Sequence, residues 1–108
     1  MNMYSYKCCD NQTEESEQIL SQLSLIKLLS DKNRLQILCV LNSGDHPVND
    51  LVDHLAVSQS LVSHHLIALK ELSLVEFERS GRQVTYSLSK KGKKVIKLLK
   101  LLSSKEEK

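Results

Sequence analysis

The sequence predicts an α+β fold: a mainly helical domain of four helices, a β-hairpin and a final helix. Three observations lead to this prediction. Apolar residues recur at steps of three and four through four stretches between residues 14 and 72. Two shorter stretches, 75–78 and 84–88, alternate apolar and polar residues around a Gly-containing turn. Residues 90–102 then return to helical spacing, and the 108-residue chain has the length of a single domain.

The first two helices are predicted at 14–29 and 31–41. The acidic start of the first helix suits the positive end of a helix dipole. Its apolar face consists of Ile19, Leu23, Ile26 and either Leu29 or Ser30. The apolar stripe of the second helix consists of Leu35, Leu38 and Leu41, with Ile37 and Cys39 beside it. A turn sequence at 42–45 ends this pair, and Pro47 stands just before the next helix, where its missing N–H costs little.

Residues 48–75 are predicted to form two helices joined by a tight turn at Ala56 and Val57. The second helix begins at Ser58, whose hydroxyl is placed to cap the first turn. The apolar positions are Val48, Leu51, Val52 and Leu55 in the short helix and Val62, Leu66, Leu69 and Leu72 in the longer one. A short helix, a turn and a longer helix form the layout of a helix-turn-helix.

The longer helix has a polar, weakly charged face at its N-terminal end. Small hydroxyl, amide and imidazole groups of this kind can contact base edges and phosphates. Many amphipathic helix pairs bind no DNA, so the hairpin that follows is the observation that favours DNA binding, because it has the position of a wing with Arg at its tip. The predicted DNA-binding residues are Ser58, Gln59, Ser60, Ser63, His64, Arg79 and Arg82.

Charge is distributed unevenly along the chain. The formal net charge is only +2. Residues 1–18 hold one Lys against four acidic residues, whereas residues 76–97 hold seven Lys and Arg against two Glu. A basic second half fits a surface that faces a polyanion such as DNA.

The predicted domain covers residues 14–102, between a flexible tail at 1–13 and a solvated tail at 103–108. No apolar run approaches a transmembrane length, and the first residues lack the apolar region of a signal peptide, so a cytoplasmic location is expected. In a reducing cytoplasm the three Cys are not expected to form structural disulfides. No Gly-rich phosphate loop, nucleophile elbow or paired carboxylates are visible, which argues against an enzyme.

From about residue 23 to residue 88 the sequence resembles the ArsR/SmtB family of winged-helix repressors. The matching segments are LSDKNRLQIL at 29–38, SQSLVSHHLIALKELSLV at 58–75 and GRQVTYSL at 81–88. The resemblance implies a homodimer built mainly from the first and last helices, which binds a palindromic DNA operator and is released by an inducer. It implies that Gln59, Ser60, Ser63 and His64 face the major groove and that Arg79 and Arg82 follow the DNA backbone.

Two residues, His65 and Ser73, lie next to this interface but are not predicted DNA contacts. His65, beside His64, is expected to be a partly buried packing residue rather than a base reader. The turn after the recognition helix usually carries Gly in the family, and here it carries Ser73. Because a position with positive φ tolerates Gly far better than Ser, either Ser73 is strained or this turn has a different shape.

Two metal sites of the family are missing from this sequence. The thiol site at the start of the helix-turn-helix has Pro47, Asn49 and Val52 at its matching positions. The zinc site on the last helix has Lys90, Lys91 and Gly92, followed by residues 103–106, and the many Lys would repel a cation. The four histidines, His46, His54, His64 and His65, have no Cys partner at metal-site spacing.

The pair Cys8–Cys9 resembles an arrangement in some arsenite sensors, where a third Cys comes from the other subunit. Adjacent thiols can both reach a soft ion such as arsenic, antimony or cadmium. The loop that carries the third ligand in those sensors has Asp45 and His46 here, which leaves Cys39 as the other candidate. The alternative is that Cys8 and Cys9 are ordinary tail residues.

Cys39 lies in RLQILCVL, which resembles the second helix of the branch that senses persulfides and oxidants. That branch places a second Cys on the last helix, where this chain has Ser103 and Ser104, so a bridge could form only with Cys8 or Cys9. The favoured interpretation of Cys39 is a small buried apolar side chain, because free Cys is among the most buried residue types. Two other functions stay open: a repressor with no metal or redox sensor, and a winged helix that binds another protein.

Overall fold

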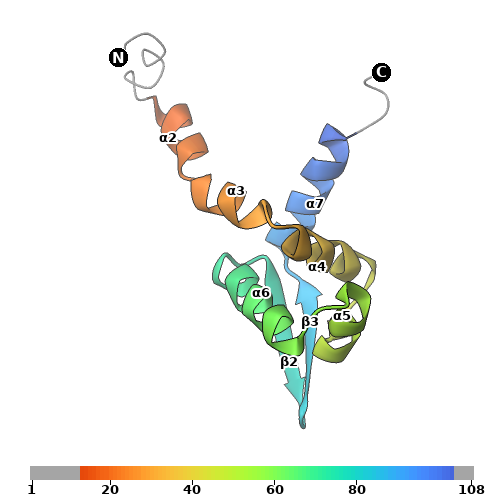
Figure 1. Ribbon diagram of the computed structural model, residues 1–108. Helices are drawn as coiled ribbons and strands as arrows, with labels where there is room; N and C mark the ends of the chain where they lie inside the picture. Colours follow the sequence, from red (N-terminus) through yellow and green to blue (C-terminus); the bar gives the residue numbers. More distant parts are fainter. Residues whose placement is uncertain (1–12, 104–108) are drawn as a thin grey trace.

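The computed structural model describes residues 13–103 and contains the predicted hairpin and all the predicted helices except the first, which is divided in two (Figure 1). The elements follow in the order α2 (Glu14–Leu20), α3 (Leu23–Leu29), α4 (Lys32–Ser43), β1 (His46–Pro47), α5 (Val48–Leu55), α6 (Gln59–Glu71), β2 (Val75–Ser80), β3 (Gln83–Leu88) and α7 (Lys90–Leu102). The predicted tails, 1–13 and 103–108, lie almost entirely outside the described residues. No helix within the described part is long and apolar enough to span a membrane.

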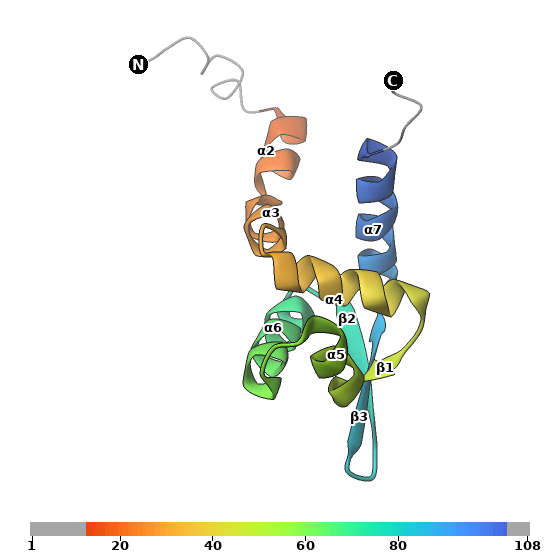
Figure 2. The ribbon, with the colours of Figure 1, turned by 45° about the vertical axis from the view of Figure 1, so that its right-hand side comes forward.

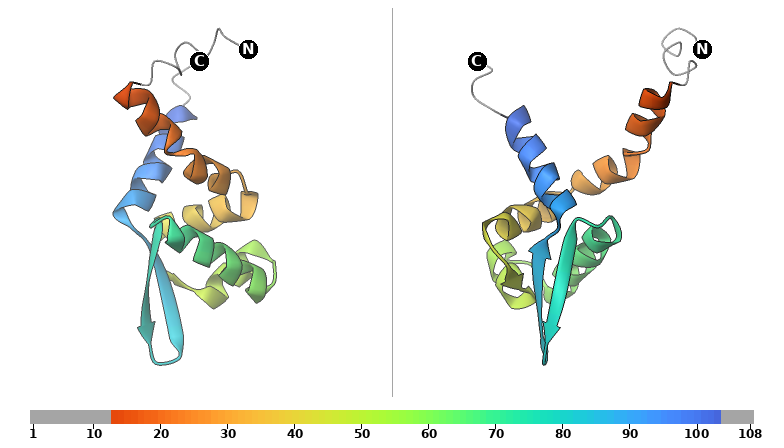
Figure 3. Two further views of the ribbon diagram at one scale, coloured as in Figure 1. Left: turned by 90° about the vertical axis from the view of Figure 1, so that its left-hand side faces the viewer. Right: turned by 180° about the vertical axis from the view of Figure 1, so that it is seen from behind.

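Helix α4 lies across the middle of the molecule (Figure 2). On one side of it, α5 and α6 pack beside the sheet, and the β2–β3 hairpin projects beyond them. On the other side, α2–α3 and α7 extend as two arms, away from the hairpin tip (Figure 3). The helix-turn-helix and the wing therefore occupy one end of the molecule, and the first and last helices occupy the other.

The core lies where α4, α5, α6, the base of the hairpin and the start of α7 meet, and it is entirely aliphatic. Each fully buried Leu, Ile or Val stabilises the fold by about 1.5–3 kcal/mol through removal of apolar surface from water. The buried apolar residues are Ile37, Leu38, Leu41, Leu51, Val62, Leu66, Leu69, Leu74, Val75, Leu88, Val95 and Ile96.

The prediction of one continuous helix at 14–29 is wrong: the segment forms two helices, α2 and α3, with a break at Ser21 and Gln22. Two competing hydrogen bonds explain the break. The hydroxyl of Ser21 donates to the backbone carbonyl of Gln18 at 2.6 Å, and the amide of Gln22 donates three residues back, to Ile19. Neither helix contains a fully buried residue, and the side chains of this segment that pack partly buried against the core, Leu25, Leu28 and Leu29, all belong to α3, so core packing does not hold α2 in line with it.

A short strand, β1, was not predicted from the sequence. His46 pairs with Tyr86 and Pro47 with Thr85, which adds an edge strand to the hairpin and gives the antiparallel order β1-β3-β2. Two residues are too few to show an alternating pattern, so no sequence signal marked this strand. Its effect is to attach the start of α5 to the wing.

Helix caps set where the functional elements begin. Ser58 caps α6 as predicted, since its hydroxyl accepts from the amide of Leu61 at 3.1 Å. Ser89 caps α7 by accepting from the amide of Gly92 at 3.0 Å, and its hydroxyl also donates to the carbonyl of Ser73. The end of the recognition helix, the base of the wing and the start of α7 are therefore tied together.

The turn after α6 keeps the left-handed conformation even though Ser73 replaces the usual Gly. Ser73 has φ +63°, which is unfavourable for a residue with a Cβ. Its amide donates to Lys70, and the amide of Leu74 donates to Leu69 at 3.0 Å, which together form a Schellman motif. Of the two alternatives left by the sequence, the strained Ser73 is the one observed.

Candidate nucleic-acid interface

The predicted reading face of α6 lies on the surface. Gln59, Ser60 and His64 are exposed and Ser63 is half-buried, while the opposite face of the helix packs into the core. These four side chains line one shallow hollow together with Ile67. The helical period brings them to one side, because residues three and four apart share a face. The structure thus places together the residues that the sequence pattern selected.

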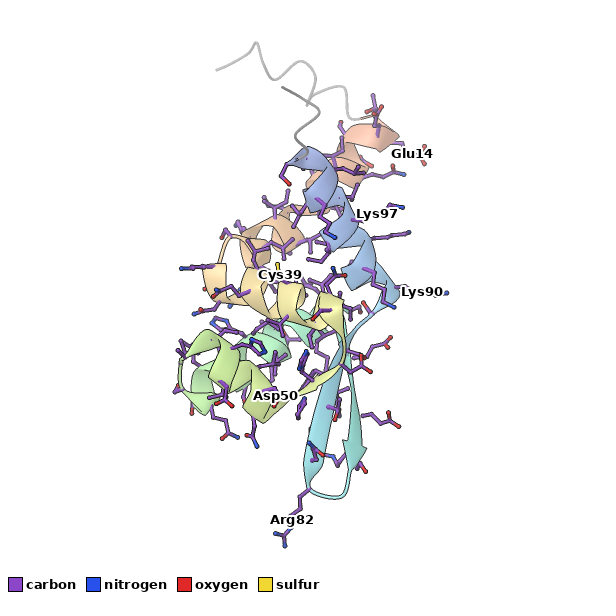
Figure 4. The ribbon with its side chains drawn as sticks, turned by 90° about the vertical axis from the view of Figure 1, so that its right-hand side faces the viewer. Glu14, Cys39, Asp50, Arg82, Lys90 and Lys97 are labelled. Atoms are coloured by element: carbon purple, nitrogen blue, oxygen red, sulfur yellow. The ribbon has the colours of Figure 1, made fainter. Side chains whose placement is uncertain are left out.

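The two predicted arginines lie at different distances from the tip of the wing. Arg82 lies in the turn between β2 and β3 and extends from the hairpin tip (Figure 4). Arg79 is exposed and lies on β2, opposite Val84 of β3. Both guanidinium groups are available for phosphate, and the tip residue reaches farthest from the helical body.

A polar crevice joins the wing to the helix-turn-helix. It has a volume of about 270 Å³ and is lined by Pro47, Val48, Asn49, Gln59, Arg82, Gln83 and Val84. Gln59 of the reading face and Arg82 of the wing therefore border the same depression, although they are far apart in sequence. Arg79 is not among the lining residues.

The first turn of α6 contains no acidic residue that would oppose the positive end of its helix dipole. Backbone N–H groups at such a helix end favour an anion. The N-terminal end of the recognition helix is therefore electrostatically suited to an approaching phosphate.

Sequence reasoning missed three residues at this surface. Asn49 and Gln83 line the crevice beside Arg82, and Ile67 is 58% exposed at the edge of the reading face. Ile67 follows Ser63 by four residues, so helical spacing was a signal for it. An exposed aliphatic group at this position can contact a thymine methyl.

His65 is buried, as expected, but it has polar partners that the sequence did not indicate. It is 4% exposed, and the Nε of Arg34 donates to its Nδ1 at 3.0 Å. Its Nε2 lies 3.9 Å from a carboxylate oxygen of Asp31. Burial lowers the pKa of His65 below 6.5, the Asp31 carboxylate acts in the opposite direction, and Arg34 and His64 lower it further. His65 is therefore held neutral near pH 7.

Asp31 caps α4 by accepting from the amides of Asn33 and Arg34 at 2.8 and 3.2 Å. Partial burial raises its pKa, but these two hydrogen bonds and the nearby His65 and Arg34 lower it more, to a net value below 3.8. The carboxylate is therefore ionised throughout the physiological range, and its contribution to stability is lost only as the pH falls below 3.8.

The cysteine predictions have different outcomes. Cys8 and Cys9 lie outside the described residues. The favoured interpretation of Cys39 as a buried packing residue is wrong, because its side chain is exposed. It sits off the buried stripe of α4, which consists of Ile37, Leu38 and Leu41. Its sulfur borders an apolar groove between α4 and α7, lined also by Leu35, Asn42, Ile96, Leu99, Lys100 and Ser103.

The histidines do not assemble a metal site within residues 13–103. In that part of the chain, no three His, Cys, Asp or Glu side chains gather in a way that could hold a metal ion. His46 instead contacts Asp50 through its Nδ1 at 3.3 Å, and its ring lies edge-on to that of His54 at 5.7 Å between centroids.

A capped recognition helix with a polar face, followed by an Arg-tipped hairpin, defines a winged helix-turn-helix regulator. A family model described as "Bacterial regulatory protein, arsR family" matches residues 31–76. The transcriptional repressor SdpR of Bacillus subtilis is 35% identical over 66 residues, which cover 61% of this chain and 73% of SdpR. The chain belongs to the ArsR family.

Further similarities agree with this assignment. The regulator NmtR of Mycobacterium tuberculosis is 39% identical over 74 residues, which cover 68% of this chain and only 62% of NmtR. The structure of reduced HlyU from Vibrio cholerae matches with a TM-score of 0.74 and 35% identity, over 83% of this chain and 97% of HlyU. The homodimeric winged helix-turn-helix DNA-binding domain Mb0332 of Mycobacterium bovis has a TM-score of 0.72 and 26% identity, over 85% and 87% of the two chains.

Proposed function

We propose that this protein is a homodimeric transcriptional repressor that binds an operator in duplex DNA. The observation that carries the proposal is the crevice lined by both Gln59 and Arg82, the side chains that we assign to groove reading and to phosphate binding. The repressor SdpR and the regulator NmtR support the regulatory role. The proposed place of action is the cytoplasm, where a bacterial chromosome lies.

The interface residues divide into two chemical roles. Gln59 can bond an adenine through two atoms, and the hydroxyls and imidazole beside it can reach other base edges in the major groove. Arg79 and Arg82 are assigned to backbone phosphates, which set affinity and orientation but carry no sequence information. The assigned base-reading residues are Gln59, Ser60, Ser63 and His64, with Ser58 at the helix start near the phosphates.

Exposed apolar side chains on the two arms support a homodimer. Soluble monomers seldom present so large an apolar surface without a binding role. The relative Mb0332 is a homodimer, and its fold matches this chain closely. The exposed large apolar residues of the arms are Ile19, Leu20, Leu23, Ile26, Leu98, Leu99, Leu101 and Leu102. We propose that α2, α3 and α7 of a second copy bury these side chains.

Release from DNA is assigned to thiol chemistry at Cys8 and Cys9, together with Cys39. The candidate signals are a thiophilic ion of arsenic, antimony or cadmium and a persulfide or oxidant. The groove at Cys39 lies between α4 of the core and α7 of the arm, so a group bound there can alter how the arm meets the DNA-binding body. A preference of a few kcal/mol for the non-binding arrangement is enough to empty an operator.

A duplex titration by fluorescence anisotropy tests the proposal. The protein is titrated into its own upstream DNA and into an unrelated duplex, with Gln59→Ala beside the wild type. Gln59→Ala should weaken the upstream complex by about 1–3 kcal/mol and leave the unrelated duplex nearly unaffected. Addition of arsenite, cadmium or a persulfide donor should release the wild type but not the variant that lacks its thiol ligands.

The variants Cys39→Ser and Cys8→Ser with Cys9→Ser separate the two thiol sites. If none of the added thiol reagents changes the duplex affinity, the protein is a repressor without this thiol sensor. Absence of salt-dependent duplex binding at any concentration would instead favour a winged helix that binds another protein and would overturn the proposal.

A further inference from the structure

A small polar cluster lies between α4 and the recognition helix, with His65 buried and its two partners half-buried. It consists of Asp31 at the N-cap of α4, Arg34 in the first turn of α4 and His65 in α6, and we term it the α4–α6 joint. The hydrogen bond between Arg34 and His65 spans 31 residues of sequence. The core that α4 and α6 share consists of apolar side chains, whose packing is not directional.

The chemistry of the joint requires a neutral imidazole. An Arg Nε always carries hydrogen and can only donate, so the Nδ1 of His65 must accept and must lack a proton. The proton of the neutral ring then sits on Nε2, on the side of Asp31. If Nδ1 gained a proton, two N–H groups would face each other at 3.0 Å and two cations would lie side by side.

The joint connects the DNA-reading face to the arm. His65 directly follows His64, which lines the reading hollow. Arg34 also donates through Nη1 to the backbone carbonyl of Leu28 in the last turn of α3, at 3.4 Å. One guanidinium therefore contacts α3 and α6 while it belongs to α4, so its bond to His65 is a polar link between the reading helix and the arm.

We propose that the hydrogen bond from Arg34 to neutral His65 holds α6 in its DNA-binding position, and that protonation of His65 releases it. Arg34 and His65 act as positioning residues, because neither lines the reading hollow or the crevice. The inference rests on the proposed DNA-binding function and adds to it a dependence of operator affinity on pH.

The surroundings of His65 set the direction of this dependence. The charged or titratable groups that influence it are Asp31 and Arg34 on α4 and His64 on its own helix, and the net effect with burial is a pKa below 6.5. The joint is therefore complete above pH 6.5, and it is lost as the pH falls below 6.5 through the lowered pKa of His65. Exposed histidines act in the opposite direction, because their protonation adds positive charge and strengthens binding to a polyanion.

The test measures duplex affinity by anisotropy between about pH 7.5 and about pH 5, at constant ionic strength, and the range extends to the acidic side because the pKa of His65 is lowered. Wild-type affinity should fall reversibly by about threefold or more as the joint protonates. His65→Gln should remove the fall, because the amide oxygen still accepts from Arg34 but does not titrate. The matched control His54→Gln alters an exposed His outside the joint and should keep the fall.

Two further measurements keep the inference independent of a folding defect. Arg34→Gln should bind weakly at about pH 7.5 and show little further change on acidification, while circular dichroism shows intact helices. Nitrogen NMR of the full-length protein at that pH should show His65 with its proton on Nε2 and a bare Nδ1.

The outcomes separate the inference from the proposed function. If the wild type binds no duplex at about pH 7.5, both are overturned. If the wild type binds but its affinity changes with pH in the same way as that of His65→Gln, only the joint is refuted. A proton found on Nδ1 of His65 refutes the joint by itself.

Discussion

Ser73 shows how one side chain can carry strain at a position that determines the fold. It ends the recognition helix at φ +63°, and its carbonyl also accepts the hydroxyl of Ser89 at the start of α7. A left-handed conformation costs a residue with a Cβ more than it costs Gly. The turn is retained because the Schellman hydrogen bonds and the cap of α7 both require it.

Ser73→Gly should therefore stabilise the protein. The free energy of unfolding, measured by urea denaturation, should rise by about 0.5–1 kcal/mol because the strain at φ +63° is relieved. Gly81→Ala is the matched control: Gly81 has the same φ with open space around it, so the added Cβ should lower stability through backbone conformation alone. A Ser73→Gly variant that is equally or less stable would contradict the assigned strain.

At the residue scale, the sequence predicted which side chains share a helix face better than it predicted the exposure or the hydrogen-bond partners of single residues. The period of a helix fixes which side chains share a side, so Gln59, Ser60 and His64 were assigned correctly to the surface. The exposure of Cys39 was missed because free Cys is buried on average, whereas Cys39 lies off the buried stripe of α4. The bond between Arg34 and His65 joins residues remote in sequence, and no local pattern reports such a pair.

Among the elements, those with strong local signals were predicted closely. The bounds of α5, α6 and α7 follow from a proline, serine caps and a turn, each of which fixes a helix start or end chemically. The break between α2 and α3 was missed because both halves keep the same apolar spacing. Strand β1 was missed because its pairing depends on where β3 lies in space.

The two arms lead to a prediction about assembly. Leu98 of α7 is 59% exposed in the single chain, so it is available to a second copy. Leu98→Glu should weaken dimerisation by about 2 kcal/mol or more, because burial of an unpaired carboxylate opposes association. Sedimentation equilibrium measures this change. The neighbouring exposed variant Lys97→Glu also adds a carboxylate but removes no apolar side chain, and it should dimerise much more strongly than Leu98→Glu.

If Leu98→Glu assembled as tightly as the wild type, with circular dichroism showing intact helices in both, α7 would not be part of the dimer surface. The apolar side chains of the arms would then need a different partner.

For the whole molecule, the basic residues that are close together in the sequence lie in different parts of the structure. Arg82 lies at the wing tip, whereas Lys90 and Lys97 lie along α7 toward the opposite end (Figure 4). The excess of basic residues in 76–97 therefore does not form one surface. Among the basic residues of 76–97, Arg82 borders the crevice that contains Gln59 of the reading helix, so the predicted polyanion-facing surface is smaller than the segment charge suggests.

The salt dependence of duplex binding tests the central claim most directly. The measurement is the slope of log affinity against log salt concentration for the wild type, Arg82→Ala and Lys97→Ala. Each lost phosphate contact lowers the slope by about 1, so Arg82→Ala should flatten it by about 1 per protomer and Lys97→Ala should leave it unchanged. Absence of wild-type binding, or an equal loss in both variants, would contradict recognition of DNA by the wing and α6.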